Sequence, residues 1–380
     1  MLGALGGAAG RGLARGGPGL LRGRTRALAA EGAGAQPGPG AAPAQQRTFD
    51  RAAKAAHRAR AAALRDAQPG GGVDPLQREV AGRLLERLDD CKRAFPAALV
   101  LGGAGEAVMP ELVTRPIERI IYVDMAERAL NRAAELHRDA LAGLAAGGAV
   151  RQELIRVQLD EEQLAEGLQE VLQPGSLDLI VAPLSLHWVN DLPGCMAQCR
   201  RLLKPDGLFL AALFGGGGGG GGGGTLEELR IACAVAEMER EGGMSARVSP
   251  LVRVSDAGNL LGGAGFALPV VDTDSITVAY EDAIQAVAHL RRMGETNANV
   301  TRRKHLPRDT ALAAAVAYHS LFEDPDDRVL SGSYEIIYMS GWRPDPSQQQ
   351  AKDRGTATAS LKDLSAALGD APDGDPPTDP

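Results

Sequence analysis

The stretch from Leu177 to Phe214 constrains the fold of this 380-residue chain more than any other. It holds an apolar strand-like segment, a polar turn, a helix that ends at the Lys-Pro-Asp-Gly sequence of 204–207, and a second apolar segment. Two strands of buried type joined by a helix predict a parallel β-α-β crossover. Ligands of such sheets bind beyond the carboxyl ends of the strands, so we expect ligand chemistry at the turn, residues 185–191.

Further apolar segments alternate with helical patterns, and together they predict a doubly wound α/β sheet. Two late strands, 268–280 and 333–342, enclose helical stretches at 282–293 and 308–323, which predicts an antiparallel hairpin at the sheet edge with a helical insertion. The other expected elements are the strands Ala97–Leu101, Glu118–Val123 and Gln152–Gln158, and the helices 76–92, Ala126–Leu144, 161–172 and Leu226–Glu241, the last with Thr225 as N-cap.

Both ends of the chain differ in composition from its middle. Residues 1–47 contain six arginines, no lysine and a single acid. Arg-rich, acid-poor N-termini are typical of organelle transit peptides. The alternative is a disordered leader with no targeting function. Phe49–Asp66 is basic and alanine-rich, so it is either a helical lead-in or the distal part of the targeting region. The tail from Arg343 is rich in Pro, Gln, Asp and Gly, which predicts disorder over most of its length.

These boundaries predict four regions along the chain. Ten consecutive glycines at 215–224 interrupt the third of them, and the backbone entropy of glycine keeps such a run from forming a fixed element. The regions are a leader at 1–47, a helical lead-in at 48–96, an α/β domain at 97–342 with a helical insertion at 281–330, and a tail at 343–380.

The charge balance argues against nucleic-acid binding. The whole chain carries −7, and removing the six arginines and one glutamate of the leader leaves −12. An acidic domain is repelled by phosphate backbones. No window approaches the ~18 consecutive apolar residues of a membrane span, so we expect no transmembrane segment and a protein that is either soluble or peripheral to a membrane.

Three strand ends carry the residues that a nucleotide cofactor would use. Gly102-Gly103-Ala104-Gly105 follows the first strand, where a glycine-rich turn lets backbone approach a ligand closely. Asp124 ends the second strand, and a carboxylate there can accept from both ribose hydroxyls. Asp160 and Glu161 follow the third strand. A plain tight turn at the glycines, and an acidic N-cap at 160–161, are the alternatives.

The turn of the opening crossover contributes His187 and Trp188. His187 has an ordinary pKa near neutral pH, so a general base or a hydrogen-bonding positioner is one interpretation. A structural histidine that caps the following helix is the other. Trp188 packs either on a cofactor or partner, or at the edge of the core.

The assembly resembles the class I S-adenosyl-L-methionine-dependent methyltransferases, which have a Rossmann-like seven-stranded sheet with a reversed last hairpin. The resemblance implies that S-adenosyl-L-methionine lies over the glycine loop. Its implied contacts are Gly102, Gly103 and Gly105 at the methionine end, Asp124 at the ribose, Asp160 or Glu161 at the adenine, and Met125 and Leu184 at the border of the site.

Six separated motifs resemble one mitochondrial family within that superfamily, the complex I assembly factors of arginine-hydroxylase type. The resemblance implies a protein on the matrix side of the inner membrane, with a complex I core subunit as client and hydroxylation of an arginine on an iron–sulfur-bearing subunit as its reaction. The motifs are LSLHWVNDLP at 184–193, LKPDG at 203–207, TLEELR at 225–230, EREGG at 239–243, GETN at 294–297 and RGTAT at 354–358.

Three positions of the glycine loop depart from the methyltransferase pattern. Val100 stands where an acid is usual, Ala104 replaces the middle glycine and Glu106 replaces the last. A carboxylate near the cofactor's own carboxylate repels it, and the missing acid removes an anchor for its amino group. Each change costs about 1–3 kcal/mol of binding, so we expect weak cofactor affinity, and we assign no metal ligands.

Three functions follow from these observations. The first is an enzyme that hydroxylates a protein arginine during complex I assembly. The second is a methyltransferase acting on a small-molecule or carrier-protein acid. The third is a non-catalytic assembly chaperone that retains the fold.

Overall fold

The structure is a computed structural model that describes residues 47–68, 71–144, 152–217, 223–350 and 355. The expected transit peptide lies outside the described residues except for its last residue. So do the centre of the glycine run, at 218–222, and most of the expected disordered tail.

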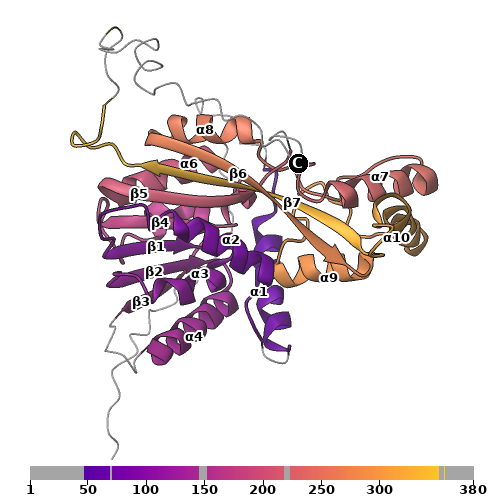
Figure 1. Ribbon diagram of the computed structural model, residues 1–380, viewed down its shortest axis with the longest axis horizontal. Helices are drawn as coiled ribbons and strands as arrows, with labels where there is room; N and C mark the ends of the chain where they lie inside the picture. Colours follow the sequence, from indigo (N-terminus) through magenta and orange to yellow (C-terminus); the bar gives the residue numbers. More distant parts are fainter. Residues whose placement is uncertain (1–46, 69–70, 145–151, 218–222, 351–354, 356–380) are drawn as a thin grey trace, which may run out of the picture. The chain divides into compact units, whose positions relative to one another are not determined.

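A seven-stranded sheet in the order β3-β2-β1-β4-β5-β7-β6 forms the centre of the domain (Figure 1). The first five strands are parallel, and β7 runs antiparallel between β5 and β6. This confirms the methyltransferase-like sheet with a reversed terminal hairpin. The strands are β1 Ala97–Leu101, β2 Arg119–Asp124, β3 Glu153–Gln158, β4 Leu177–Pro183, β5 Leu203–Phe214, β6 Ala267–Tyr280 and β7 Leu330–Trp342.

Helices cover both faces of the sheet because its central strands are apolar on both sides. In β1, Ala98 and Val100 belong to one core, and Leu99 and Leu101 belong to the other, as the two-residue period of a strand requires. The helices on the first face are α2 Pro75–Glu86, α3 Gly105–Leu112 and α4 Glu127–Leu144; those of the second are α5 Leu164–Gly167, α6 Leu192–Leu202 and α8 Val254–Gly263.

Two local predictions were wrong, and one helix was missed. The helix expected at 161–172 is a short 3-10 turn, η2 Glu161–Gln163, followed by the single turn α5, where Gly167 weakens further helix formation. Helix α8 was not predicted. Thr225 is not an N-cap: Leu226 takes that position, and the Thr225 hydroxyl bonds to the backbone of Glu335 in β7 instead.

The N-terminal helix α1 (Arg51–Asp66) lies at the carboxyl edge of the parallel strands (Figure 1). The chain just before it is tied to the distant segment after α9 (Ala283–Met293): Phe49 bridges to Asn299, and the Asp50 N–H donates to Ala298 O at 2.8 Å. Helix α1 is thus packed against the elements that carry the candidate site.

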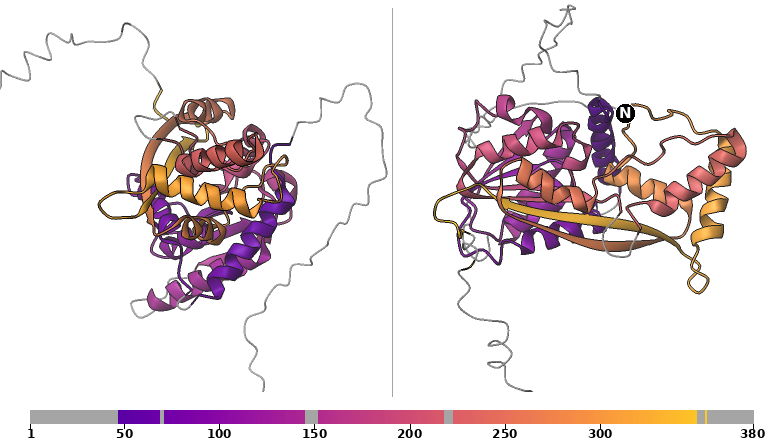
Figure 2. Two further views of the ribbon diagram at one scale, coloured as in Figure 1. Left: turned by 90° about the vertical axis from the view of Figure 1, so that its right-hand side faces the viewer. Right: turned by 90° about the horizontal axis from the view of Figure 1, so that it is seen from above.

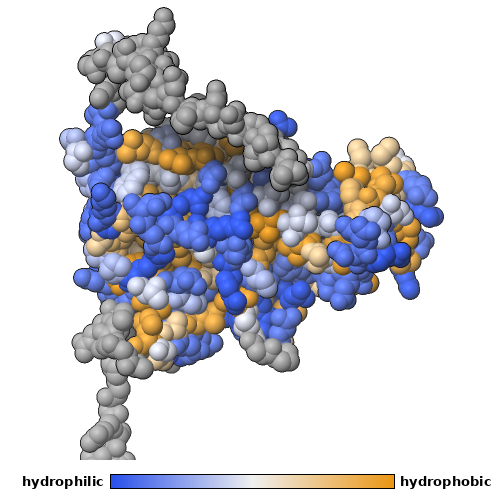
Figure 3. Space-filling model, in the orientation of Figure 1, coloured by the Kyte–Doolittle hydropathy of each residue, from blue (hydrophilic) through white to orange (hydrophobic). Residues whose placement is uncertain are grey.

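Helices α7 (Glu227–Glu241) and α10 (Arg308–Phe322) pack together at the far end of the long β6–β7 hairpin (Figure 2). Apolar side chains remain exposed on this pair, and orange surface is visible there in Figure 3. The most exposed are Val235, Met238, Leu312, Val316 and Leu321. Within the described ranges, no helix is both long and apolar enough to cross a membrane.

Candidate functional site

Helix α1 turns a row of cations toward the sheet. Spacings of three, four and seven residues place them on one side of an α-helix. The Asp50 carboxylate caps the helix by accepting from the Ala53 N–H at 2.9 Å, and the alanines between the cations favour helix formation. The cations are Arg51, Lys54, Arg58 and Arg65.

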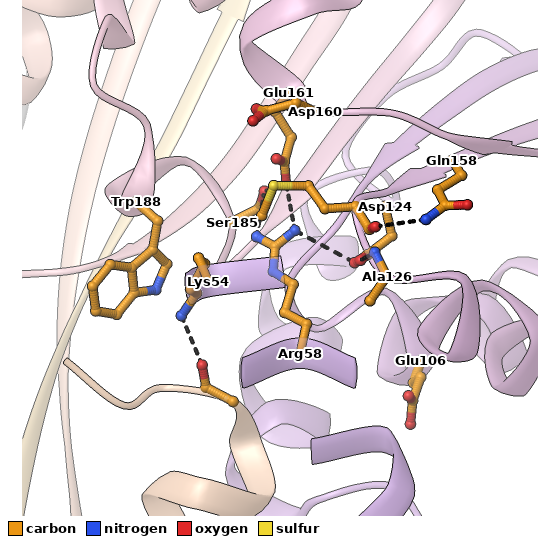
Figure 4. Close-up of polar contacts among 12 residues, drawn as sticks. Lys54, Arg58, Glu106, Asp124, Ala126, Gln158, Asp160, Glu161, Ser185 and Trp188 are labelled. Atoms are coloured by element: carbon orange, nitrogen blue, oxygen red, sulfur yellow. Dashed lines mark hydrogen bonds and ion pairs between the residues drawn. The ribbon is translucent and has the colours of Figure 1, made fainter. Parts of the chain in front are cut away.

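The guanidinium group of Arg58 lies against two buried carboxylates at the ends of two strands (Figure 4). Asp124 ends β2 and Glu161 follows the adjacent parallel strand β3, so their carboxylates meet at one edge. Arg58 Nη1 lies 2.5 Å from Glu161 Oε1 and 3.4 Å from Asp124 Oδ2. Its Nη2 donates to Ser185 Oγ at 3.4 Å. Both carboxylates are fully buried, so each depends on this one guanidinium for much of its charge balance.

Arg51 extends the cluster to a third acid. Its Nη2 lies 2.8 Å from Asp160 Oδ1 and also contacts Glu161. The Asp160 carboxylate accepts from the Glu162 N–H at 2.9 Å and caps the turn η2. Asp160 therefore has the N-cap role that its position after β3 allowed, and contact with an adenine stays a prediction.

Burial raises the pKa of both acids and the arginines lower it, but burial has the larger effect on Asp124 and the arginines have the larger effect on Glu161. Burial raises the pKa of Asp124 to about 6, and the nearby Arg58 only partly offsets it. Burial acts in the same direction on Glu161, but the charges of Arg58 and Arg51 outweigh it and lower the pKa of that carboxyl to about 2. Glu161 is thus the fixed negative charge of the cluster, and Asp124 is the group that takes up a proton as the solution becomes mildly acidic.

The glycines of the expected cofactor loop face protein atoms. Gly102 has a φ of +44°, and a Cβ there would lie 2.4 Å from Glu161 Oε1 and 2.5 Å from Arg58 Nη1. At Gly103, with a φ of +56°, a Cβ would lie 2.1 Å from the Pro183 carbonyl oxygen. Glycine is required at both positions by internal packing as well as by the tight turn.

With α1 in this position, the residues do not fit S-adenosyl-L-methionine. Asp124, the expected ribose ligand, is fully buried beneath Arg58, and Gly102 is covered by the same guanidinium. Leu184, at a φ of +50°, is fully buried, and its N–H donates to Ala212 O. Met125 is partly buried, and its carbonyl accepts from Gln158. A cofactor over this loop would need the space that Arg58 takes.

Glu106, a departure from the methyltransferase pattern, is neutralised inside the protein. Its two carboxylate oxygens accept from Arg65 of α1 at 2.8 Å and from Arg132 of α4 at 2.7 Å. The predicted repulsion of a cofactor carboxylate by Glu106 is therefore weaker than the sequence alone implied, because two guanidinium groups compensate its charge.

His187 belongs to a second buried network, centred on Glu295. The Glu295 carboxylate accepts from His187 Nε2 at 3.0 Å and Trp188 Nε1 at 2.6 Å, and lies 3.1 Å from Lys54 Nζ. Burial alone would raise the pKa of Glu295, but Lys54 and His187 lower it to about 2. An ionised carboxylate only accepts hydrogen bonds, so His187 carries its proton on Nε2 and a lone pair on Nδ1. Burial lowers the pKa of His187, which keeps it neutral at pH 7.

A pocket of about 380 Å³ lies beside this network, and Arg58 is not among the residues that line it. His187, Trp188 and Glu295 line one wall, and apolar side chains such as Phe214 and Leu229 line others. Cations line the remaining part, namely Arg247, Arg291, Arg302, Arg303 and Lys304. An apolar pocket with a cationic lining is chemically suited to an anion with an apolar body.

Sequence reasoning missed the contribution of α1. The expected residues Gly102, Asp124 and Glu161 do lie together. The sequence did not predict that Arg58 and Ser185 contact them. His187 lies apart from them, in the Glu295 network. The usable signal was the spacing of the four cations in an alanine-rich helix, which marks a buried charged face.

In the part of the chain that the structure describes, no group of three or more His, Cys, Asp or Glu is placed to hold a metal ion. The sequence His137-Arg138-Asp139 has a spacing found in iron-binding triads. It lies on α4, where residues two apart point to different sides of the helix. His137 Nε2 contacts Gln152 instead.

The sheet order defines a class I methyltransferase-like protein, and a family model described as "Methyltransferase domain" matches residues 100–211. The chain belongs to the NDUFAF5 family of mitochondrial arginine hydroxylases. It is 39% identical over 279 residues to the human "Arginine-hydroxylase NDUFAF5, mitochondrial", covering 73% of each chain. It is 44% identical over 196 residues to the Dictyostelium discoideum protein of that name, covering 52% of this chain and 43% of that one.

More distant relatives include bacterial methyltransferases. The chain is 34% identical over 186 residues to a malonyl-[acyl-carrier protein] O-methyltransferase of Xylella fastidiosa, covering 49% of this chain and 58% of that one. Among solved structures, a Bacillus halodurans protein described as a putative methyltransferase aligns with a TM-score of 0.45 and 16% identity, covering 70% of this chain and 99% of that one.

Proposed function

We propose that this chain is a mitochondrial assembly factor of respiratory complex I that hydroxylates an arginine of an iron–sulfur core subunit. The observation that carries the proposal is its 39% identity to the human arginine hydroxylase over 73% of both chains. The buried acids that already hold arginine side chains support it, because a protein that modifies arginine must recognise a guanidinium group.

The proposed reaction is a two-electron oxidation of the client. One C–H or N–H bond of the arginine is replaced by a bond to oxygen: R–H + O₂ + 2 e⁻ + 2 H⁺ gives R–OH + H₂O. Dioxygen supplies the inserted atom, and a two-electron reductant supplies the electrons for the water. The residues of this chain contribute binding, orientation and exclusion of solvent.

His187 is proposed as the proton acceptor for a substrate that reaches the pocket, because its side chain lines that cavity and not the acid cluster. Its Nδ1 carries the lone pair, lies buried without a partner among the described residues, and belongs to a side chain that lines the pocket. His187→Asn removes a titratable base, so product formation should fall at least about 100-fold. An equal fall in Phe214→Leu, a neighbouring pocket residue without titratable groups, would contradict a specific role.

Mass spectrometry of client peptides tests the function. Peptides of complex I core subunits are compared between cells that have this protein and cells that lack it. The proposal expects one arginine to lose the mass of a single oxygen atom when the protein is absent, and to regain it when the wild-type chain is restored. An arginine that stays oxygenated in its absence contradicts the proposal.

The same cells separate catalysis from scaffolding. Asp124→Asn is restored in place of the wild-type chain, and complex I assembly is followed on native gels. An unmodified arginine with deficient assembly is the expected result. Full assembly with an unmodified arginine would favour the chaperone function.

A matrix location, peripheral to the inner membrane, completes the proposal. It is supported by the mitochondrial relatives and by the exposed apolar side chains of α7 and α10, which suit a client or membrane surface. Protease protection of isolated mitochondria tests it: the protein should be degraded only after the inner membrane is opened. Release by alkaline carbonate, which strips peripheral proteins, should distinguish it from an integral protein.

The pocket favours one second candidate, a methyltransferase that acts on a small-molecule or carrier-protein acid. Its cationic lining suits a carboxylate, and the Xylella relative is named for such a substrate. This candidate requires S-adenosyl-L-methionine, which would supply the methyl group, and it requires Arg58 to leave Gly102. Calorimetric titration of the full chain with S-adenosyl-L-methionine should release binding heat if it is correct, and should release none if it is wrong.

A further inference from the structure

The acid cluster already contains a bound guanidinium group, and that group fits imperfectly. Arg58 is 4% exposed, yet its Nε is buried with no hydrogen-bond partner among the described residues. Its contacts to Asp124 and Ser185 are both long, at 3.4 Å, and only the contact to Glu161 is close. An arginine entering along a different axis would meet the same three acceptors and is free to satisfy Nε as well.

The acceptors select a guanidinium over other ligands. Without Arg58 the site would present the Asp124 carboxylate, Glu161 Oε1 and the Ser185 hydroxyl, all fully buried, while the other Glu161 oxygen stays with Arg51. Such a site repels phosphates and carboxylates. A planar guanidinium has several N–H donors that can reach separate acceptors at once, whereas an ammonium group is a compact point charge.

The helix that carries Arg58 is attached mainly through charge. Apart from its cations, the buried side chains of α1 are two alanines, Ala61 and Ala62. Gln68 and Gly71 lie in the short connection from α1 to α2. An element held by ion pairs can exchange its arginine for an arginine from elsewhere with little loss of apolar contact.

From this arrangement we propose that Asp124, Glu161 and Ser185 form the guanidinium-binding subsite for the client arginine, and that Arg58 occupies the subsite until the client displaces it. The proposal rests on the proposed function and names where that substrate binds. In the free protein Arg58 neutralises the two buried carboxylates. When the client binds, its arginine replaces Arg58, which moves into solvent.

Chemical rescue of an Arg58→Ala variant tests the subsite. The full-length variant should unfold at a lower temperature than the wild type, and N-acetyl-arginine amide should raise its Tm by about 3–5 °C at about a hundred times the dissociation constant. N-acetyl-lysine amide carries the same charge without the planar fork and should raise it by less than about 1 °C. Arg60→Ala, which removes an exposed arginine of the same helix, is the matched control and should show no rescue.

Three results would overturn the subsite. The first is equal rescue by the lysine compound or by sodium chloride. The second is undiminished rescue in the Arg58→Ala/Glu161→Gln double variant. The third is a Tm shift with S-adenosyl-L-methionine and none with the arginine compound, which would assign the same space to the nucleotide.

Hydrogen exchange of the wild-type full chain tests displacement and does not depend on a variant that folds. A client peptide with its arginine should increase exchange of the α1 amides, and the same peptide with lysine should not. Unchanged α1 exchange at saturating arginine peptide would contradict displacement. Arginine rescue in vitro together with an unmodified client in cells would refute the hydroxylase function while leaving the subsite intact, so the two proposals can fail separately.

Discussion

Two neighbouring regions of this protein have opposite electrostatic character. The cluster under α1 is built from acids at strand ends, of which Asp124 and Glu161 are fully buried, and it is filled by arginines of the same chain. The pocket is hollow, has apolar walls, and is lined by five cations. The Glu295 network separates them, with Lys54 on the side of α1 and His187 on the side of the pocket.

The difference shows which ligand each region can accept. A guanidinium group would be attracted to the acids and repelled by the cationic pocket, and an anion would behave in the opposite way. A methyltransferase acting on a carboxylate would use the pocket, and an arginine hydroxylase would use the cluster. Substitutions that change the charge of one region and leave the other intact therefore separate the two candidate functions.

The largest expected effect is in the cluster. Glu161→Gln removes the charge that faces both Arg51 and Arg58, which are nearly buried. Leaving buried cations without their carboxylate should cost about 3–5 kcal/mol of unfolding free energy, measured by urea denaturation. Glu162→Gln is the matched control, because Glu162 is 27% exposed and lies 3.7 Å from Arg51; it should cost under about 1 kcal/mol. Similar losses in the two variants would contradict the central role of Glu161.

The next largest effect on stability is expected in the Glu295 network, which separates the two regions. Glu295→Ala leaves the Trp188 N–H without its acceptor and leaves the Lys54 amine with only the Gly294 carbonyl as its acceptor. Burial lowers the pKa of Lys54 to about 7 even with Glu295 present. Lys54 can therefore lose its proton in the variant, which limits the cost to about 2–3 kcal/mol. Glu295→Gln keeps an acceptor for Trp188 and should cost about half as much in the same urea experiment.

The sheet could be predicted from the sequence because unbroken apolar runs, such as the one that contains Leu99 and Val100, predict strands that are buried on both faces. The sequence was also sufficient to bring Gly102, Asp124 and Glu161 together, because parallel strands end at one edge. It could not predict that Arg58 enters the cluster. That contact spans 103 residues along the chain to Glu161 and depends on how α1 docks. Helical periodicity identifies a charged face, but it does not identify the acids that face it.

A smaller effect should appear in the dependence of stability on pH. The pKa of Asp124 is raised from 3.8 to about 6, so between these values the folded protein holds a proton that the unfolded chain has lost. The stabilisation from this group is complete below pH 3.8 and is lost as the pH rises through 6. Glu161 and Glu295 have pKa values lowered from 4.5 to about 2. Their stabilisation is present above pH 4.5 and is lost as the pH falls from 4.5 toward 2.

The difference between the wild type and Asp124→Asn isolates Asp124 between pH 4.5 and 6.5, because the buried and half-buried histidines, whose pKa values burial lowers, titrate in both proteins. The unfolding free energy of the wild type should fall by about 2 kcal/mol relative to Asp124→Asn as the pH rises across this interval. Urea titrations of both proteins at several pH values measure the difference. Parallel pH profiles would show that the pKa of Asp124 is not raised, and the cluster would then lack the buried, partly uncompensated carboxyl described above.

The smallest effect is expected at the pocket. Arg303 is 47% exposed and pairs with Glu241, so solvent screens the pair, and Arg303→Gln should change the unfolding free energy by under about 1 kcal/mol. The same substitution should weaken binding of an anionic amphiphile such as decanoate by about 2–5-fold, because one of the five cations is lost. Decanol, which has the apolar body without the charge, is the control ligand. A stability loss as large as that of Glu161→Gln would mean that the cations serve the fold, whereas a selective loss of decanoate binding would mean that they are arranged for an anionic ligand.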